Sequence, residues 1–210
     1  NGYKVYWEDG SQIVSPQDQD ILKHVADVER YEDVKTMDKD KAIADGLFCM
    51  VPASVDENYY QALIQQTIHG DIIPKVADDI KIVYTPLHGT GNVPVRRVLK
   101  ELGFEQVTVV PEQELPDGDF PTVSAPNPEN EDALSMGIAL AKEVGADIVI
   151  GTDPDSDRIG SAVRKGEDFV LISGNQMGAL LTYFLCLTRK ETLTPESTMV
   201  KTVVTGELGA

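Results

Sequence analysis

Hydrophobic and polar positions change period along this chain. From Ile80 onward, short apolar runs alternate with stretches in which apolar residues recur every three to four positions. The runs are typical of buried strands, and the wider spacing is typical of amphipathic helices. The strands expected are 80–85, 107–110 and 147–150, and the helices between them are marked by Val95–Leu102 and Leu134–Ala141. This alternation predicts an α/β fold with a mixed, largely parallel sheet covered by helices.

Two loops in this region follow predicted strands directly. They are Pro86–Gly91 and the acidic stretch Gly151–Gly160. In parallel sheets, ligands collect beyond the carboxyl ends of the strands. We therefore expect these two loops to be neighbours. The intervening segment 111–128 is rich in proline and is predicted as a long loop.

The flanking segments carry weaker patterns. In the first part, Ser15–Pro16 should open a helix with Ser15 as its cap and Ile21, Val25 and Val28 as its buried stripe. Residues 31–46 lack clear periodicity and are predicted as loop. The remaining expectations are a hairpin over 3–14, a strand at 47–51, a helix opened by the capping box Ser54–Glu57, a break at 70–74, strands at 159–163, 169–173 and 199–205, and an apolar helix around Met177–Leu185.

The formal net charge is −17 over 210 residues, and the acidic residues are spread along the chain. Such a surface should repel nucleic acid and anionic membranes, so we expect neither as a partner. The longest apolar run, around Gly178–Leu187, is too short to span a bilayer. Cys49 and Cys186 lie in apolar surroundings and are expected as buried, reduced thiols, which points to a cytoplasmic protein.

The acidic stretch contains the strongest chemical signal. Asp153, Asp155 and Asp157 lie at i, i+2 and i+4, and Pro154 disfavours a helix. In a looped backbone, alternate side chains can converge, and three converging anions require a cation between them. An all-oxygen set suits a hard ion such as Mg²⁺ rather than zinc. Arg158 follows at once, and guanidinium groups bind phosphate bidentately.

An EF-hand and a solvated acidic turn are the two alternatives to a magnesium site in this stretch. An EF-hand needs glycine at position six and glutamate at position twelve, but Arg158 and Arg164 stand there. The stretch is therefore not an EF-hand. A solvated acidic turn stays open as the structural alternative.

The loop His88-Gly89-Thr90-Gly91 could cradle a phosphate at the start of the next helix, or could be an ordinary glycine-rich turn. It matches neither the Walker A pattern nor the full dinucleotide fingerprint, because Pro94 stands at the last glycine position. His24 and His69 are expected as surface or core residues. Arg96 and Arg97 are expected on the solvent side of their helix.

Together these residues resemble a known family. Gly151–Gly160 resembles the magnesium loop of the α-D-phosphohexomutases, which include phosphoglucomutases and phosphomannomutases, and Thr85–Gly91 resembles the loop that opens their second domain. Asn1–Lys4 resembles the segment after their catalytic serine, and Lys201–Thr205 resembles a strand of their third domain. The resemblance implies three-layer α/β domains. It also implies a Mg²⁺-dependent transfer of a phosphoryl group between a phosphoserine and a phosphorylated hexose, through a bisphosphate sugar.

The resemblance also assigns roles by position. Asp153, Asp155 and Asp157 would be the metal ligands, and Arg158 would hold the reacting phosphate. Lys4 would assist proton transfer, while His88 and Gly89 would lie near phosphate. The alternative in another class is a non-catalytic module that binds a divalent ion or phosphate, and the alternative within the enzyme class is a metal-dependent sugar phosphatase.

The resemblance implies a division of the chain. Residues 1–74 would be the end of a first domain whose catalytic serine precedes Asn1, 75–168 would be the second domain with the metal loop, and 169–210 would open a third. The chain is therefore expected to be a fragment without mutase activity of its own, from a parent that interconverts hexose 1-phosphate and hexose 6-phosphate.

Overall fold

A computed structural model describes residues 4–203 and 205–207, and the chain divides into two compact units, Asn1–Val55 and Asp56–Ala210. Residues 1–3, which belong to the predicted hairpin and to the resemblance described above, lie outside the described part.

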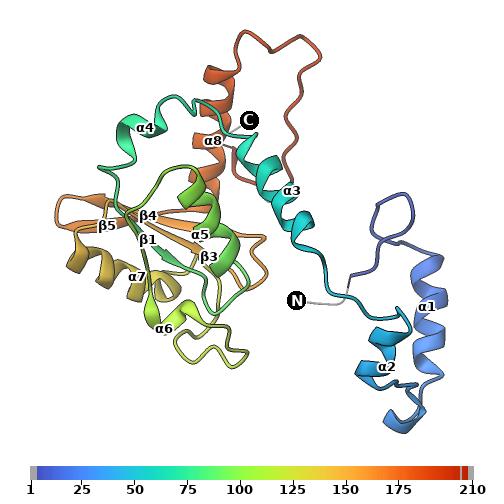
Figure 1. Cartoon of the computed structure of the whole chain (residues 1–210). Helices are drawn as coiled ribbons and strands as arrows, with labels where there is room; N and C mark the ends of the chain where they lie inside the picture. Colours follow the sequence, from blue (N-terminus) through green and yellow to red (C-terminus); the bar gives the residue numbers. More distant parts are fainter. Residues whose placement is uncertain (1–3, 204, 208–210) are drawn as a thin grey trace. The chain divides into compact units, whose positions relative to one another are not determined.

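A mixed sheet forms the centre of the second unit (Figure 1). Within the described residues its strand order is β2-β1-β3-β4-β5, with β2, β1 and β3 parallel and β4 and β5 antiparallel to their neighbours. The expected mixed, largely parallel α/β fold is confirmed. The strands are β1 (Ile82–Thr85), β2 (Val107–Val109), β3 (Ile148–Thr152), β4 (Ile159–Lys165) and β5 (Asp168–Ile172).

Helices cover this sheet on two sides. The crossovers from β1 to β2 and from β2 to β3 run in opposite directions along the sheet, so right-handed connections place α5 and α7 on opposite faces (Figure 1). The helices along this part of the chain are α3 (Ala53–Ile64), α4 (Ile73–Val76), α5 (Asn92–Glu101), α6 (Pro111–Glu114), α7 (Glu131–Val144) and α8 (Gly174–Thr188).

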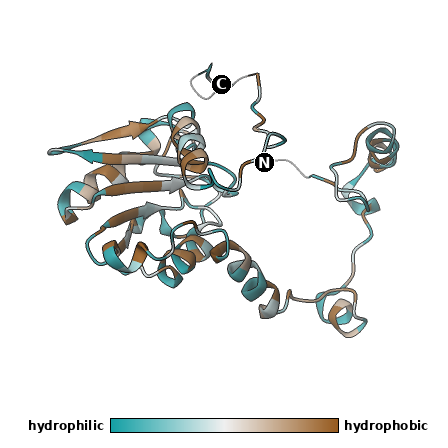
Figure 2. Cartoon of the chain, turned by 90° about the horizontal axis from the view of Figure 1, so that it is seen from above, coloured by the Kyte–Doolittle hydropathy of each residue, from teal (hydrophilic) through white to brown (hydrophobic). Residues whose placement is uncertain are grey.

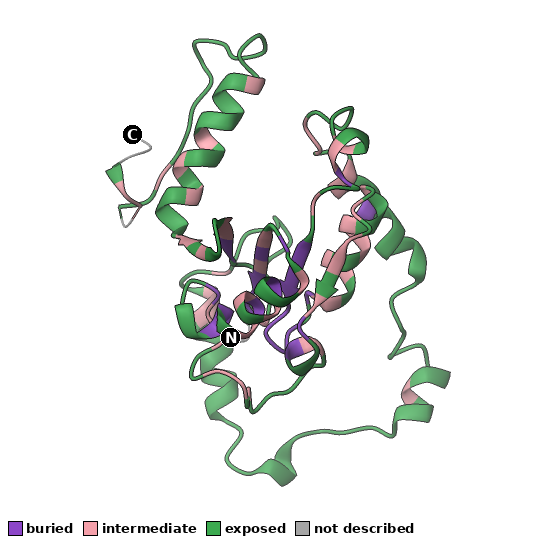
Figure 3. Ribbon diagram, turned by 90° about the vertical axis from the view of Figure 1, so that its left-hand side faces the viewer, coloured by how far each residue is buried: buried purple, intermediate pink, exposed green. Residues whose placement is uncertain are grey.

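The core lies between α7 and the sheet. Leu134 of α7 is fully buried, as are Val83, Val149 and Ala162 of three adjacent strands. These strands are among the most hydrophobic segments in Figure 2, and the buried residues concentrate there in Figure 3. Helix α7 ends as predicted at Gly145, whose left-handed backbone (φ 68°) closes the helix. The loops at the carboxyl ends of the strands are therefore attached to a well-packed sheet.

The first unit differs from its prediction in several places. Its helices are α1 (Gln17–Ala26), the 3₁₀ turn η1 (Tyr31–Asp33) and α2 (Lys39–Ala44). Pro16, rather than Ser15, occupies the N-cap of α1, and the expected buried stripe is exposed at Ile21, Val25 and Val28. Helix α2 falls in the predicted loop, where the Asp38 side chain caps it by accepting from the Lys41 amide.

Two strands expected from short apolar runs are absent from the described residues. Residues 47–51 form no strand, and neither do 199–203 or 205; Val204 is outside the described part. The hairpin is reduced to one bridge, Tyr6–Gln12, around the Asp9–Gly10 turn. Neither 47–51 nor the described part of 199–205 pairs with a strand of the sheet, and apolar residues alone do not make a sheet.

The segment after β4 extends the same sheet. Strand β5 pairs with β4, so the expected division after residue 168 falls where the sheet continues to Ile172. Helix α8 follows with a full capping box between Ser173 and Gln176. The assignment of 1–74, 75–168 and 169–210 to three domains remains a prediction.

The two cysteines contradict the expectation of burial, because Cys49 and Cys186 are both exposed and unbridged. Among the described residues, no helix has the combined length and apolar character that a membrane span requires.

Candidate metal and phosphate site

The acidic loop is the connection between two antiparallel strands. Thr152 of β3 pairs with Ile159 of β4, so Asp153 and Arg158 face each other directly beyond the last pair. The amide of Asp153 donates to the carbonyl of Arg158 at 3.4 Å, and the amide of Ser156 donates back to the carbonyl of Asp153 at 3.0 Å. Ser156 has a left-handed backbone (φ 60°), which tightens the turn. Strand register therefore determines where the loop begins and ends.

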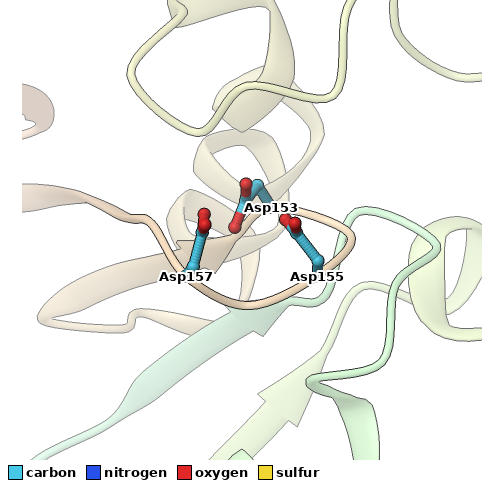
Figure 4. A group of neighbouring side chains, drawn as sticks. All are labelled: Asp153, Asp155 and Asp157. Carbon is cyan, nitrogen blue, oxygen red and sulfur yellow. The ribbon is translucent and has the colours of Figure 1, made fainter. Parts of the chain in front are cut away.

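The three aspartates project into one small space (Figure 4). Each offers a carboxylate oxygen, and these oxygens all lie within 4.8 Å of one another. Asp153 is fully buried, while Asp155 and Asp157 are exposed. The predicted convergence of alternate side chains is thus present in the structure.

Arg158 is the cation nearest to this group. Its Nε donates to Asp153 Oδ2 at 2.9 Å, its backbone amide donates to Asp153 Oδ1 at 2.9 Å, and Nε lies 3.8 Å from Asp157 Oδ1. Burial acts to raise the pKa of Asp153, but the hydrogen bonds from the Arg158 amide and guanidinium outweigh it and hold that pKa below its ordinary value. Asp153 in turn raises the pKa of Arg158. Both groups therefore stay charged near neutral pH.

The donor set fits a hard divalent cation. Mg²⁺ binds oxygen at about 2.1 Å, which brings adjacent ligand oxygens to roughly 3 Å, so binding would draw these carboxylate oxygens, which lie within 4.8 Å of one another, closer together. The three carboxylates and Arg158 together carry a formal charge of −2. Each carboxylate oxygen of Asp153 accepts one hydrogen bond from Arg158 and has a second lone pair that could bind a metal. Asp153, Asp155 and Asp157 are the residues that could hold the ion.

The loop Pro86–Gly91 lies directly against the acidic loop, as the parallel topology predicts. The Thr90 amide and hydroxyl both donate to the carbonyl of Pro154, at 2.9 and 3.1 Å. A Cβ on Gly89 would come within 2.7 Å of the same carbonyl oxygen. A Cβ on Gly91 would come within 2.7 Å of the hydroxyls of Tyr84, Thr152 and Ser156. Both glycines therefore permit the close approach of the two loops.

His88 is buried, and its ring is turned toward the segment after α6. Its Nδ1 lies 3.1 Å from the carbonyl of Leu115, and its Nε2 lies 2.9 Å from Thr122 Oγ1. Since a carbonyl can only accept, Nδ1 is the donor in its contact with Leu115. Any approach of phosphate to His88 and Gly89 would therefore use the backbone of this loop rather than the imidazole.

The remaining sequence candidates are exposed or pair with other side chains. Lys4 is exposed in the first unit, and His24 and His69 are exposed in helical and turn segments. Arg97 is not simply solvated, because it bonds Glu57 and Glu101 at 2.6 Å each and stacks 4.2 Å above the Tyr60 ring. Arg96 bonds Glu114 at 2.6 Å.

Sequence reasoning missed the contribution of strand-end hydroxyls. Tyr84 Oη and Thr152 Oγ1 lie 2.8 Å apart, both largely buried, and join the ends of β1 and β3 beneath the two loops. The available signal was a polar residue at the end of each apolar run. Such a polar residue marks the end of a strand, but it does not reveal that Tyr84 and Thr152, 68 positions apart, would be hydrogen-bond partners.

Together, the fold and the acidic loop define a class: an α/β domain with three converging carboxylates at the carboxyl edge of its sheet. Residues 57–166, more than half of the chain, match the family model described as phosphoglucomutase/phosphomannomutase, alpha/beta/alpha domain II. The chain therefore belongs to the phosphoglucomutase/phosphomannomutase family.

Similar proteins carry several names within this class. The chain is 34% identical to a phosphoglucomutase of Staphylococcus saprophyticus over 99% of its own length and 37% of the relative's. It is 36% identical to the phosphopentomutase of Homo sapiens over 91% of its length and 31% of the relative's. A glucose 1,6-bisphosphate synthase of Homo sapiens is 35% identical over 88% and 30%. The chain thus spans about a third of the length of these relatives.

Among solved structures, a putative phosphomannomutase from Thermus thermophilus is similar, with a TM-score of 0.48 and 23% identity over 64% of this chain and 28% of that one.

Proposed function

We propose that this chain is the metal-binding part of a Mg²⁺-dependent phosphohexomutase, an enzyme that interconverts hexose 1-phosphate and hexose 6-phosphate through a phosphoserine and a bisphosphate sugar. The observation that carries the proposal is the convergence of Asp153, Asp155 and Asp157 beside Arg158 within a domain of this family. The parent protein is proposed to be phosphoglucomutase-like and cytoplasmic, with the 210-residue chain lacking turnover by itself.

Each residue at the site has a task that its contacts support. The three aspartates would hold Mg²⁺, which when bound would neutralise charge on the phosphoryl oxygens. Asp153 fixes the Nε edge of the Arg158 guanidinium at 2.9 Å, so the side chain is oriented before a ligand arrives. The terminal nitrogens of Arg158, which is half exposed, could then bind phosphate oxygens as a fork. Phosphoryl transfer depends mainly on such positioning and charge neutralisation.

Two further roles come from the resemblance alone. Lys4 is proposed as a general acid–base group for a sugar hydroxyl. His88 and Gly89 are proposed to lie near phosphate, with the backbone of their loop as the contacting part. Asp153, Asp155, Asp157 and Arg158 are the stronger assignments, because the folded chain brings them together.

A pentose phosphate is the second candidate substrate. The 36% identity to a phosphopentomutase is comparable to the 34% identity to a phosphoglucomutase. Both reactions move phosphate between positions of one sugar, and the acidic loop could serve either.

Metal binding by the 210-residue chain is the direct test. Calorimetric titration with Mg²⁺ and Mn²⁺ should show one site in the wild type and none in a triple variant Asp153→Asn, Asp155→Asn and Asp157→Asn. Asp119→Asn, an exposed aspartate on another loop, is the matched control and should bind as the wild type does. Equal titrations of the wild type and the triple variant would refute the metal site.

The reaction itself is tested in the full-length parent. With Asp155→Asn, turnover of glucose 1-phosphate should fall by several orders of magnitude, while the control Asp119→Asn should retain it. Parallel assays with ribose 1-phosphate separate the two substrate classes. Release of inorganic phosphate without isomerisation would replace the mutase proposal with a phosphatase.

A further inference from the structure

Gln113 is a fully buried polar residue in the segment that the sequence presents as a proline-rich loop. Both ends of its amide are bonded. Its Oε1 accepts from Thr85 Oγ1 at 2.7 Å, and its Nε2 donates to Thr122 Oγ1 at 3.1 Å. Its backbone carbonyl accepts from the His88 amide at 2.9 Å. One residue therefore links the end of β1, the His88 loop and the segment after α6.

These bonds continue into the loop on both sides. Thr85 Oγ1 also accepts from the Leu87 amide at 3.1 Å, and the Thr122 hydroxyl lies 2.9 Å from His88 Nε2. Leu87 and His88 have positive φ angles of 47° and 60°, which non-glycine residues adopt at an energetic cost. Such conformations persist when the surrounding bonds over-determine them. Gln113 bonds both Thr85 and Thr122, and so it links the hydrogen bonds that reach Leu87 with those that reach His88.

The supported loop then reaches the acidic loop. Thr90 donates twice to the carbonyl of Pro154, and Pro154 separates Asp153 from Asp155 in the chain. We infer that Gln113 is a positioning residue: it holds Leu87 and His88 in their left-handed conformations and, through Thr90 of the same loop, holds the acidic loop in the shape that brings its carboxylates together. This inference rests on the proposed function of that loop as a metal site.

The chemistry of glutamine suits this position. The site requires an acceptor toward Thr85 and a donor toward Thr122, separated by the width of a planar amide. Leucine fills a similar volume but leaves both hydroxyls without this partner. Glutamate would place a charge in a fully buried position. Partners that orient a metal site indirectly can control its affinity even though they never touch the ion.

The test compares the 210-residue chain with two variants and one control. Gln113→Leu removes both side-chain bonds, and Thr122→Val removes the hydroxyl that joins Gln113 to His88, at a partly buried position. Leu140→Ala, on α7 at a partly buried position packed against the core cluster, should destabilise the fold without touching this network. Two quantities are measured for each folded protein: the Mn²⁺ affinity by titration, and the hydrogen-exchange rate of the Thr90 amide.

We expect Gln113→Leu to weaken Mn²⁺ binding roughly tenfold and to accelerate exchange at Thr90, with Thr122→Val acting in the same direction. Leu140→Ala should leave the affinity unchanged. Folded Gln113→Leu and Thr122→Val proteins with wild-type affinity and wild-type exchange at Thr90 would overturn the inference. If the wild type binds no Mn²⁺, the proposed function fails, whereas the Thr90 exchange rates still decide whether Gln113 holds the loop.

Discussion

The carbonyl oxygen of Pro154 accepts two hydrogen bonds from Thr90, one from the amide at 2.9 Å and one from the hydroxyl at 3.1 Å. The two residues are 64 positions apart and lie on loops that follow adjacent parallel strands, β1 and β3. This contact joins the glycine-containing loop to the centre of the acidic loop. The spacing of the aspartates therefore depends on a neighbour that carries no charge.

Gly89→Ala should separate these loops. The added Cβ would come within 2.7 Å of the Pro154 carbonyl oxygen and closer still to its Cα, and both belong to backbone that cannot rotate away. We expect a loss of about 1–3 kcal/mol in the free energy of unfolding, as for other overpacked sites. Divalent-ion affinity should fall as well. Urea denaturation and calorimetric titration measure the two effects.

Gly118→Ala is the matched control for that prediction. Gly118 lies in the loop after α6, has no positive φ, and a Cβ there would meet nothing within 4 Å. Its variant should fold and bind metal as the wild type does. If Gly89→Ala behaves in the same way, the close approach of the two loops is not needed for the site.

The region from β1 to β5 could be predicted because its apolar residues follow strand and helix periods and are in fact buried. Val83 and Val149 lie in continuous apolar runs, and Leu134 lies on a regular helical stripe. The first unit shows the limit of this reasoning. Ile21 and Val25 have helical spacing and lie on a helix, yet both are exposed. Periodicity reveals which face is apolar but not whether another element covers it.

The candidate site was predictable to a similar extent. Alternate aspartates in a loop predict their own convergence, because that geometry is local. Gln113 could not be found in this way, since its partners Thr85 and Thr122 are 28 and 9 positions away and meet only after folding. The glycines of the His88 loop have a role that the sequence pattern did not indicate: at Gly89 and Gly91 they make room for the neighbouring loop.

Leu134→Ala tests the packing beneath the site. Leu134 is fully buried against the core, and its Cδ2 fills the space beside Gly151, immediately before the acidic loop. Truncation should lower the free energy of unfolding by about 2–5 kcal/mol, because it removes apolar contact and leaves a cavity. Leu187→Ala, at an exposed position of α8, should change it by less than about 0.5 kcal/mol. Denaturation in urea would contradict the prediction if both variants changed stability equally.

The pair of Glu57 and Arg97 predicts a pH-dependent link between α3 and α5. The hydrogen bond from Arg97 holds the pKa of Glu57 below its ordinary value of 4.5. A carboxyl whose pKa is lower in the folded state stabilises the fold above its unfolded pKa. That contribution is lost as the pH falls through the folded pKa, below 4.5. The free energy of unfolding should therefore fall as the pH is lowered through this range. The fall should be less steep in Glu57→Gln than in the wild type.

A double-mutant cycle isolates this pair from other acidic groups. Glu57→Gln and Arg97→Gln should show a coupling energy at pH 7 that is smaller at pH 3, as measured by urea denaturation at each pH. The Arg97–Tyr60 stack is lost in both variants that lack Arg97, so it cancels from this coupling energy. Equal coupling at both pH values would show that the charge of Glu57 does not contribute.

Arg158→Ala should have opposite effects on stability and metal affinity. In the metal-free protein, the Arg158 guanidinium offsets repulsion among three carboxylates. Its loss should cost about 1 kcal/mol, a modest figure because the side chain is 53% exposed. A bound cation would take over this role and would no longer be repelled by the guanidinium, so Mg²⁺ affinity should rise roughly threefold to tenfold. Arg158→Lys keeps the positive charge and should bind Mg²⁺ nearly as the wild type does. Calorimetric titration of each variant with Mg²⁺ measures this affinity. If Arg158→Ala binds Mg²⁺ more weakly than the wild type, Arg158 serves the site mainly by holding Asp153 in place. That effect would then outweigh the repulsion between Arg158 and the metal.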